Sequence, residues 1–113
     1  MEIIRKNKEF NPHECGVINF LNLVGGKWKV LIIFGISKGW NRFSLLKKES
    51  PFISKQMLVN QLRELETDGI IERTIFAEVP PRVEYKLTPF GETLIPVIRV
   101  IRDWGKDNLK NQK

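Results

Sequence analysis

Apolar residues recur at helical spacing in successive stretches of the chain before residue 70. The first stretch, residues 16–23, ends at a pair of glycines, which commonly terminate helices. The second, residues 27–37, is apolar on nearly every side and predicts a helix buried almost all round. A third, shorter stretch at residues 42–50 predicts a helix that stops before Pro51.

The fourth helical stretch, residues 54–68, has one apolar side and one polar side. At about 100° per residue, three leucines fall in one stripe and three polar side chains lie almost opposite. Ser54 is well placed as the N-cap. Two helices joined by a tight turn, the second polar on its outer face, form a helix-turn-helix. The leucines are Leu58, Leu62 and Leu65, and the polar residues are Gln56, Asn60 and Arg63.

After residue 69 the pattern changes to alternation, which predicts two strands. Residues 70–78 and 82–87 both alternate between apolar and polar positions. The link between them contains Pro80 and Pro81, which have no amide hydrogen to donate to a strand ladder. We therefore expect a β-hairpin with a stiff, projecting tip.

The last helix is predicted to begin at Thr88-Pro89, an N-cap residue followed by a proline at the first helical position. Pro96 lies within it and should kink the helix or leave one carbonyl unpaired. The apolar stripe along this helix indicates packing on a second copy of the chain; the alternative is that it covers the chain's own core. The stripe consists of Phe90, Leu94, Val97, Ile98, Ile101 and Trp104.

These elements together predict a mainly α fold with a small β-hairpin, in the order of a winged helix-turn-helix. A chain of 113 residues suits one domain of this kind. We expect a polar N-terminal arm at residues 1–14, the winged-helix domain at residues 15–108 and a polar tail at residues 109–113. No apolar run reaches the roughly 18 residues of a membrane span, and no signal-peptide core is present. We therefore expect a cytoplasmic protein without a membrane partner.

Positive charge is concentrated in the middle third of the chain. The net charge is +6 overall, yet between Lys27 and Arg63 eight basic residues stand against Glu49 alone. A phosphate backbone is the natural partner for so local an excess, because each neutralised phosphate releases counterions. The polar side of the fourth helix fits the same partner, since amides pair with adenine and guanidinium groups with guanine. The alternative is an ordinary solvated helix face.

The sequence gives little support to an enzyme or a metalloprotein. It contains no recognisable Ser/His/Asp set, glycine-rich phosphate cradle or paired carboxylates, so we expect no catalysis and no cofactor. His13 and Cys15 are the only soft metal ligands, too few for a closed site, so we expect no metal. Cys15 is the only cysteine, and any disulfide must therefore join subunits or a small thiol.

Several blocks of this sequence resemble the HxlR-type winged-helix transcriptional regulators, relatives of the MarR group, over roughly residues 14–106. The blocks are GGKW at 25–28, RFSLL at 42–46, ISKQMLVNQLRELETDGIIER at 53–73 and VPPRVEYKLT at 79–88. The resemblance implies a homodimer that binds pseudo-palindromic, double-stranded operator DNA. It also implies that the first and last helices form the dimer contact. We assign this contact to Val17, Ile18, Leu21, Leu94, Ile98, Ile101 and Trp104.

The resemblance further implies that the helix beginning at Ser54 lies in the major groove of each half-site. Gln56 is the best candidate to read a base, because the N-terminal end of such a helix enters the groove. Asn60 and Arg63 are candidates for base or phosphate contacts. Ser54 and Lys55, at the helix start, are candidates to hold a phosphate.

The hairpin tip is implied to lie at the flanking minor groove or backbone. Arg82 suits a narrow, A·T-rich minor groove, where the negative potential is enhanced. The alternative for Arg82 is an ion pair with Glu78 or Glu84. Three further basic residues are either phosphate contacts or solvated surface residues: Arg42, Lys47 and Lys48.

Cys15 directly precedes the first helix, where the positive helix end favours a thiolate. Some HxlR-type regulators sense oxidants or electrophiles with a cysteine here, so the resemblance implies a thiol sensor; the alternative is a buried, inert cysteine. Family members often have proline after this cysteine, whereas Gly16 follows here and loosens the backbone. The sequence thus predicts a sequence-specific, DNA-binding transcriptional regulator with an oxidant, electrophile or small molecule as effector. The alternative is a winged-helix module that binds proteins rather than specific DNA.

Overall fold

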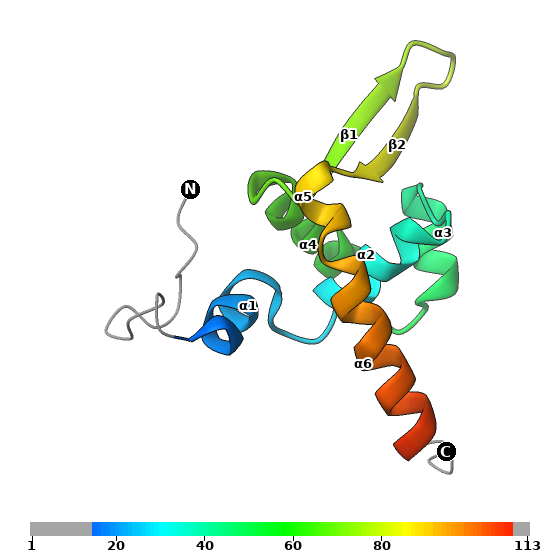
Figure 1. Cartoon of the computed structure of the whole chain (residues 1–113). Helices are drawn as coiled ribbons and strands as arrows, with labels where there is room; N and C mark the ends of the chain where they lie inside the picture. The colour runs from blue at the N-terminus through cyan, green and yellow to red at the C-terminus, as the bar shows by residue number, and fades with distance from the viewer. Residues whose placement is uncertain (1–14, 110–113) are drawn as a thin grey trace.

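The computed structural model describes residues 15–109, which form six helices and a two-stranded hairpin (Figure 1). The elements are α1 (Gly16–Val24), α2 (Lys29–Ser37), α3 (Phe43–Glu49), α4 (Lys55–Thr67), β1 (Ile71–Phe76), β2 (Arg82–Leu87), α5 (Pro89–Glu92) and α6 (Ile95–Asn108). The predicted fold class, mainly α with a β-hairpin in winged helix-turn-helix order, is confirmed. The predicted N-terminal arm and residues 110–113 of the predicted tail lie outside the described residues.

The second helix of the helix-turn-helix, α4, begins with the predicted N-cap and is followed by a glycine at its end. Ser54 has extended backbone angles, and its Oγ accepts a hydrogen bond from the Met57 amide at 3.0 Å. This bond satisfies one of the N–H groups that a helix leaves open at its start. At the other end Gly69 has a φ of +76°, a conformation that glycine adopts without steric cost.

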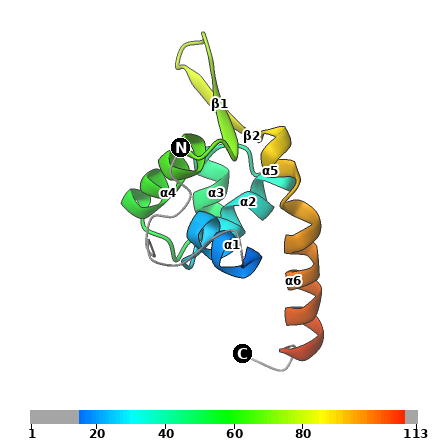
Figure 2. The same cartoon turned by 60° about the vertical axis from the view of Figure 1, so that its left-hand side comes forward.

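Strands β1 and β2 form an antiparallel wing that projects from the helices (Figures 1 and 2). The register runs from the pair Ile71 and Leu87 at the base to Phe76 and Arg82 near the tip. Ile71 and Leu87 are both buried, whereas Ile75 on the same face of β1 is exposed. The base of the wing therefore belongs to the core, Tyr85 of β2 packs against it, and the part of the wing near the tip extends away from it.

The chain after the wing departs from the single helix that the sequence predicts. Thr88 caps a short α5 as expected, accepting a hydrogen bond from the Gly91 amide at 3.0 Å. The chain then turns at residues 93–94 and starts α6, so that Pro96 lies in the first turn of the new helix. A proline there removes no helical hydrogen bond. The helix is broken before Pro96 rather than kinked around it.

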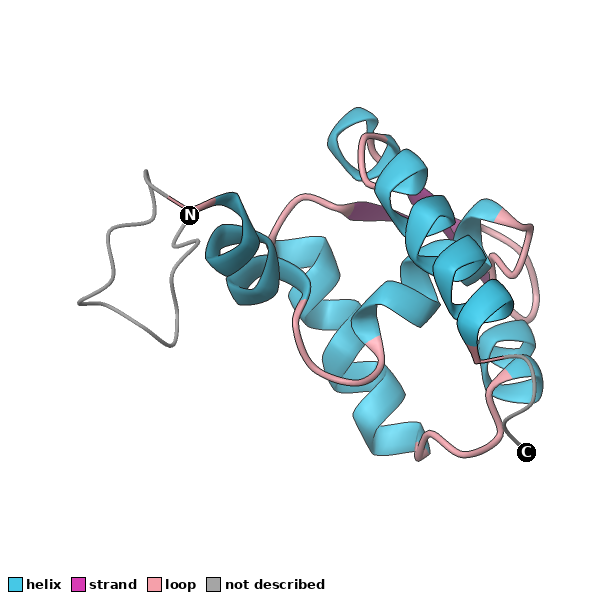
Figure 3. Ribbon diagram, turned by 60° about the horizontal axis from the view of Figure 1, so that its bottom comes forward, coloured by secondary structure: helices cyan, strands magenta, loops and turns pink. Residues whose placement is uncertain are grey.

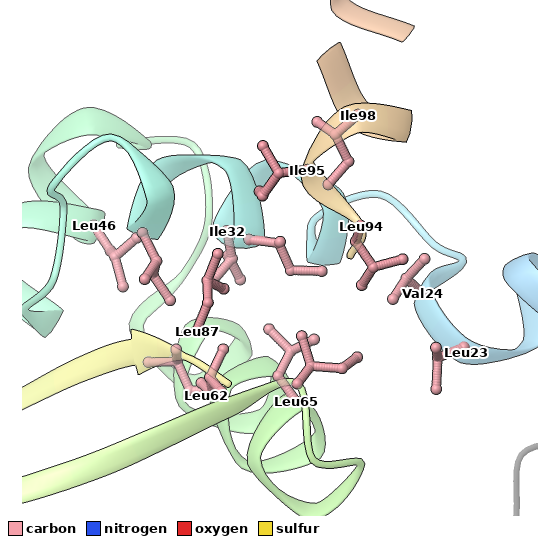
Figure 4. Close-up of a cluster of buried hydrophobic side chains, with 14 of the residues drawn as sticks. Leu23, Val24, Ile32, Leu46, Leu62, Leu65, Leu87, Leu94, Ile95 and Ile98 are labelled. Carbon is pink, nitrogen blue, oxygen red and sulfur yellow. The ribbon is translucent and has the colours of Figure 1, made fainter. Parts of the chain in front are cut away.

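One hydrophobic core joins the end of α1, α2, α3, α4, the base of the wing and the start of α6 (Figure 4). Leu94 and Ile98, which we predicted at the dimer contact, are only 7% and 3% exposed and belong to this core. That assignment is corrected, because both side chains are already covered by their own chain. The alternative that the stripe covers its own core is thus right for these two positions.

Of the two terminal helices, only the end of α1 and the start of α6 contribute buried residues to this core. In Figure 3, α1 lies to one side of the other helices and is joined to α2 by a loop. The C-terminal part of α6 runs beyond the helical body (Figures 1 and 2). Within residues 15–109 no single helix is long and apolar enough to cross a membrane; α1 and α2, bent by 80° to each other, reach that length and composition only as a pair.

Candidate nucleic-acid interface

Helix α4 separates its two faces as the sequence predicts. Leu58, Leu62 and Leu65 are buried in the core. The candidate DNA-binding residues of this region all lie on the exposed side: Ser54, Lys55, Gln56, Asn60 and Arg63. The buried leucines fix which side of α4 faces outward, because rotating the helix would expose them to water. The outer surface of α4 is therefore a fixed array of amide, hydroxyl and cationic groups.

Two amides of this array are joined to each other. Gln56 Nε2 donates a hydrogen bond of 3.0 Å to Asn60 Oδ1, one turn further along α4. Residues four apart on a helix lie side by side, so this bond requires no distortion of the helix. The pair presents its amide groups as one polar unit on the outer face.

Lys47 of α3, one of the predicted phosphate contacts, is hydrogen-bonded to the turn between α3 and α4. Lys47 Nζ donates to the Pro51 carbonyl oxygen at 3.0 Å and so braces the turn that leads into α4. Lys48, the next residue on α3, is exposed. The structure therefore gives Lys47 a structural contact of its own and leaves Lys48 at the surface.

Arg82 makes the ion pairs that the sequence left as its alternative. Its guanidinium lies 3.2 Å from Glu78 and 3.5 Å from Glu84, and it stacks over the Phe76 ring at 4.1 Å from the centroid. The Glu84 carboxylate also lies 4.0 Å from the guanidinium of Arg42, the residue that directly precedes α3. The carboxylate of Glu84 thus connects the wing with the helix-turn-helix.

One basic residue of the middle third is unavailable to an external partner. Lys29, at the start of α2, has a side chain only 7% exposed, and its Nζ lies 2.5 Å from Oε1 of Glu64 on α4. Counting charges along the chain could not distinguish this lysine from surface lysines. The ion pair ties α2 to the helix that carries the candidate DNA-binding residues.

Exposed apolar side chains occur on α1 and on the outer half of α6. Ile18 is half-buried, and the other predicted dimer residues at the surface are Val17, Leu21, Ile101 and Trp104. Sequence reasoning did not assign Val97 or Val100 to this contact, although both are exposed on α6. Val97 could have been assigned to the contact from its place in the apolar stripe, whereas Val100 lies outside that stripe.

Cys15 occupies the N-cap position of α1. It is half-buried, with extended backbone angles, and its carbonyl oxygen accepts a hydrogen bond from the Asn19 amide at 3.2 Å. The thiol is a free one and makes no capping hydrogen bond to the described part of the helix. The predicted position at a helix start is confirmed, and its chemical role remains a prediction.

The fold is shared with known regulators. The sequence model of the HxlR-like helix-turn-helix family matches residues 23–113. The uncharacterized HTH-type transcriptional regulator YybR of Bacillus subtilis is 42% identical over 104 residues, covering 92% of this chain and 83% of YybR.

Solved structures show the same relationship. The redox regulator HypR in its oxidized form has a TM-score of 0.79 and 44% identity, covering 83% of this chain and 97% of HypR. The reduced form of the transcriptional regulator YodB from B. subtilis has a TM-score of 0.71 and 32% identity, covering 88% of this chain and 98% of YodB. This chain belongs to the HxlR-like helix-turn-helix family of transcriptional regulators.

Proposed function

We propose that the protein acts as a homodimer that binds a pseudo-palindromic operator, with one α4 in the major groove of each half-site. The observation that carries this proposal is the division of α4 into a buried leucine face and an exposed face bearing Gln56, Asn60 and Arg63. A helix with that division can enter a groove without disturbing the core. Paired recognition helices one helical turn apart match the two half-sites of a palindrome.

The roles follow from where each residue lies on the helix-turn-helix. Gln56, in the first turn of α4, reads a base edge, and Asn60 and Arg63 extend the contact along the groove. Ser54 and Lys55 hold a phosphate at the helix start, where the helix dipole and open N–H groups favour an anion. The remaining basic residues contact the backbone on either side: Arg42, Lys47 and Lys48.

The wing contacts the flanking DNA through Arg82. In the free protein its guanidinium is paired with Glu78 and Glu84, which holds the side chain in place along the wing. DNA offers an alternative set of acceptors in the minor groove, so binding exchanges carboxylate partners for base and sugar acceptors. Because DNA binding breaks the ion pairs with Glu78 and Glu84, Arg82 contributes less to the affinity than an unpaired arginine would.

The dimer forms through α1 and α6. These are the two elements at the edges of the described structure, and both carry exposed large apolar residues. The contact residues that the core leaves available are Val17, Ile18, Leu21, Ile101 and Trp104. Burying them in a second copy removes apolar surface from water.

A thiol response through Cys15 is the second part of the proposal, favoured by the similarity to the redox regulators HypR and YodB. Two thiols give up two protons and two electrons to an oxidant such as diamide and form one disulfide, between subunits or with a small thiol. An electrophilic effector would alkylate the same sulfur. Either change at the start of α1 alters the dimer contact and hence the spacing of the two α4 helices.

The thiol response is tested by titrating DNA before and after diamide treatment of the wild type and Cys15→Ser. We expect diamide to shift the affinity of the wild type and to leave that of Cys15→Ser unchanged. An unchanged wild type would show that Cys15 is an inert cysteine, the alternative left open by the sequence.

The family finding favours DNA over a protein as the partner of the winged helix. We therefore propose that the protein is cytoplasmic, where it would act on chromosomal DNA. The test of DNA binding is a selection of duplexes from a random library by the purified full chain, followed by titration of the selected and a scrambled duplex at several salt concentrations. We expect tighter binding of the selected duplex and a steep fall of both affinities with salt. Failure to enrich any sequence, or weak binding that ignores salt, would instead support a protein-binding module.

A further inference from the structure

Phe52 is the most exposed large aromatic side chain in the described part of the protein. It lies in the turn between α3 and α4, two residues before the N-cap Ser54, and is 92% exposed. An exposed phenylalanine leaves apolar surface in water that burial would remove. Sequence reasoning passed over this residue because it falls in a turn, outside every periodic pattern.

The turn that carries Phe52 is held on both sides. The next residue, Ile53, is buried in the core, and its amide donates to the Ser50 carbonyl oxygen at 3.2 Å. On the other side, the Pro51 carbonyl oxygen accepts the 3.0 Å hydrogen bond from Lys47 Nζ. The backbone of Phe52 is thus fixed relative to α4, and its ring is displayed outward at the N-terminal end of that helix.

The surroundings of the ring favour a nucleic acid as its partner. Lys48 on α3 and Lys55 at the start of α4 are exposed on either side of the turn. From residue 47 to residue 55 the chain carries three lysines against Glu49, and this net positive charge is suited to a phosphate backbone. The N-terminal end of a recognition helix is the part that meets base edges. In the major groove the apolar group that a phenylalanine can contact is the C5-methyl group of thymine.

We propose that Phe52 contacts the C5-methyl group of a thymine at the edge of each operator half-site and so contributes to sequence preference. This inference rests on the proposed placement of α4 in the major groove. It adds an apolar contact to the polar ones made by Gln56 and Asn60. Burying one methyl group against the ring corresponds to about fourfold in affinity.

The experiment replaces thymine by uracil, which removes the methyl group and keeps the base pairing. The probe is the duplex selected from the random library, with uracil placed at one thymine of each half-site at a time. Dissociation constants are measured for the wild type, Phe52→Ala and Phe52→Leu, with Phe90→Ala as the matched control, since Phe90 is an exposed phenylalanine on α5. Thermal unfolding of each variant confirms that it is folded.

We expect one thymine position at which uracil weakens wild-type and Phe90→Ala binding by about fourfold. Phe52→Ala should bind the thymine duplex about as weakly as the wild type binds the uracil duplex, and uracil should have no further effect on it. Phe52→Leu should retain part of the preference for thymine.

Three results overturn the inference while leaving the proposed function intact. In the first, the wild type binds the selected duplex preferentially but uracil at no thymine position weakens its binding. In the second, the selected duplex has no thymine at the edges of its half-sites. In the third, uracil weakens the binding of Phe52→Ala as much as it weakens that of the wild type. If the wild type selects no duplex at all, the proposed function fails and this inference fails with it. The third of these results, together with normal binding of the thymine duplex by Phe52→Ala, would leave a protein as the partner of the ring.

Discussion

Gln56 donates a hydrogen bond of 3.0 Å to Asn60 across one turn of α4. The two side chains that sequence reasoning proposed as separate base contacts are therefore coupled in the free protein. A residue that is hydrogen-bonded to a neighbour before DNA arrives has lost part of its rotamer freedom already. The pair is partly ordered for recognition, and changes at the two positions should not be additive.

Gln56→Ala should relax sequence preference. Removing a base-reading amide costs about 1–3 kcal/mol at one base step and little on random DNA. Titration of the selected and scrambled duplexes with Gln56→Ala, Asn60→Ala and the double variant measures both the loss and the coupling. Equal losses on the two duplexes would contradict a reading role for Gln56, and strict additivity would contradict the coupling.

Lys55→Ala should weaken all sequences alike. A lysine that contacts phosphate adds to affinity without regard to sequence, and its removal lowers the salt dependence of binding by about one unit of slope. The measurement is the logarithm of affinity against the logarithm of salt concentration for both duplexes. The control is Lys106→Ala on α6, which lies far along the chain from α4 and should leave the slope as it is. A loss confined to the selected duplex would show that Lys55 reads sequence.

Glu64→Gln should destabilise the fold more than Lys29→Met does. The Lys29 side chain is almost completely buried, and removal of its carboxylate partner leaves a charge that water does not reach. Lys29→Met removes the buried charge itself, so no unpaired charge is left in the interior. Because Glu64 is half exposed, we expect a cost of about 1–3 kcal/mol for Glu64→Gln. Urea unfolding of both variants tests this order, and the reverse order would rule out the buried lysine as the source of the cost.

Tyr85 should ionise at higher pH in the folded protein than in the unfolded chain. Burial raises the pKa of Tyr85, Arg73 nearby opposes the rise, and Glu66 adds to it. A raised folded pKa means that stability is fully present below the pKa of the unfolded chain and is lost as the pH rises through the folded pKa. The chain has one tyrosine, so the tyrosinate absorbance reports this residue alone. Coincident titrations of native and denatured protein would contradict the prediction, and Tyr85→Phe supplies the blank.

The elements of this fold were predictable because their signals are local. The leucine spacing and the serine cap defined α4, and the two prolines defined the tip between two alternating segments. The break before α6 needed tertiary information. Pro96 indicates that a continuous helix is interrupted. Whether the helix kinks or a new helix starts depends on how Leu94 and Ile98 reach the core.

The sequence predicted which face of α4 is exposed, but it did not predict which basic side chains are buried or paired. Periodicity gives the direction of a side chain on a helix, so Gln56 and Asn60 were placed correctly on the outside. Charge counting carries no information on burial or pairing. Lys29 therefore counted toward the basic surface although it is buried, and the ion pairs of Arg82 could be named only as an alternative. Phe52 escaped notice because a turn residue has no period.

The central claim is that two copies of α4 meet two successive major grooves on one face of the duplex. A hydroxyl-radical footprint of the full chain on the selected duplex, combined with methylation interference at guanine N7, measures this directly. We expect two symmetric protected regions whose centres are about 10 base pairs apart, with interference at major-groove positions in both. A single protected region, or protection without major-groove interference, would contradict the account.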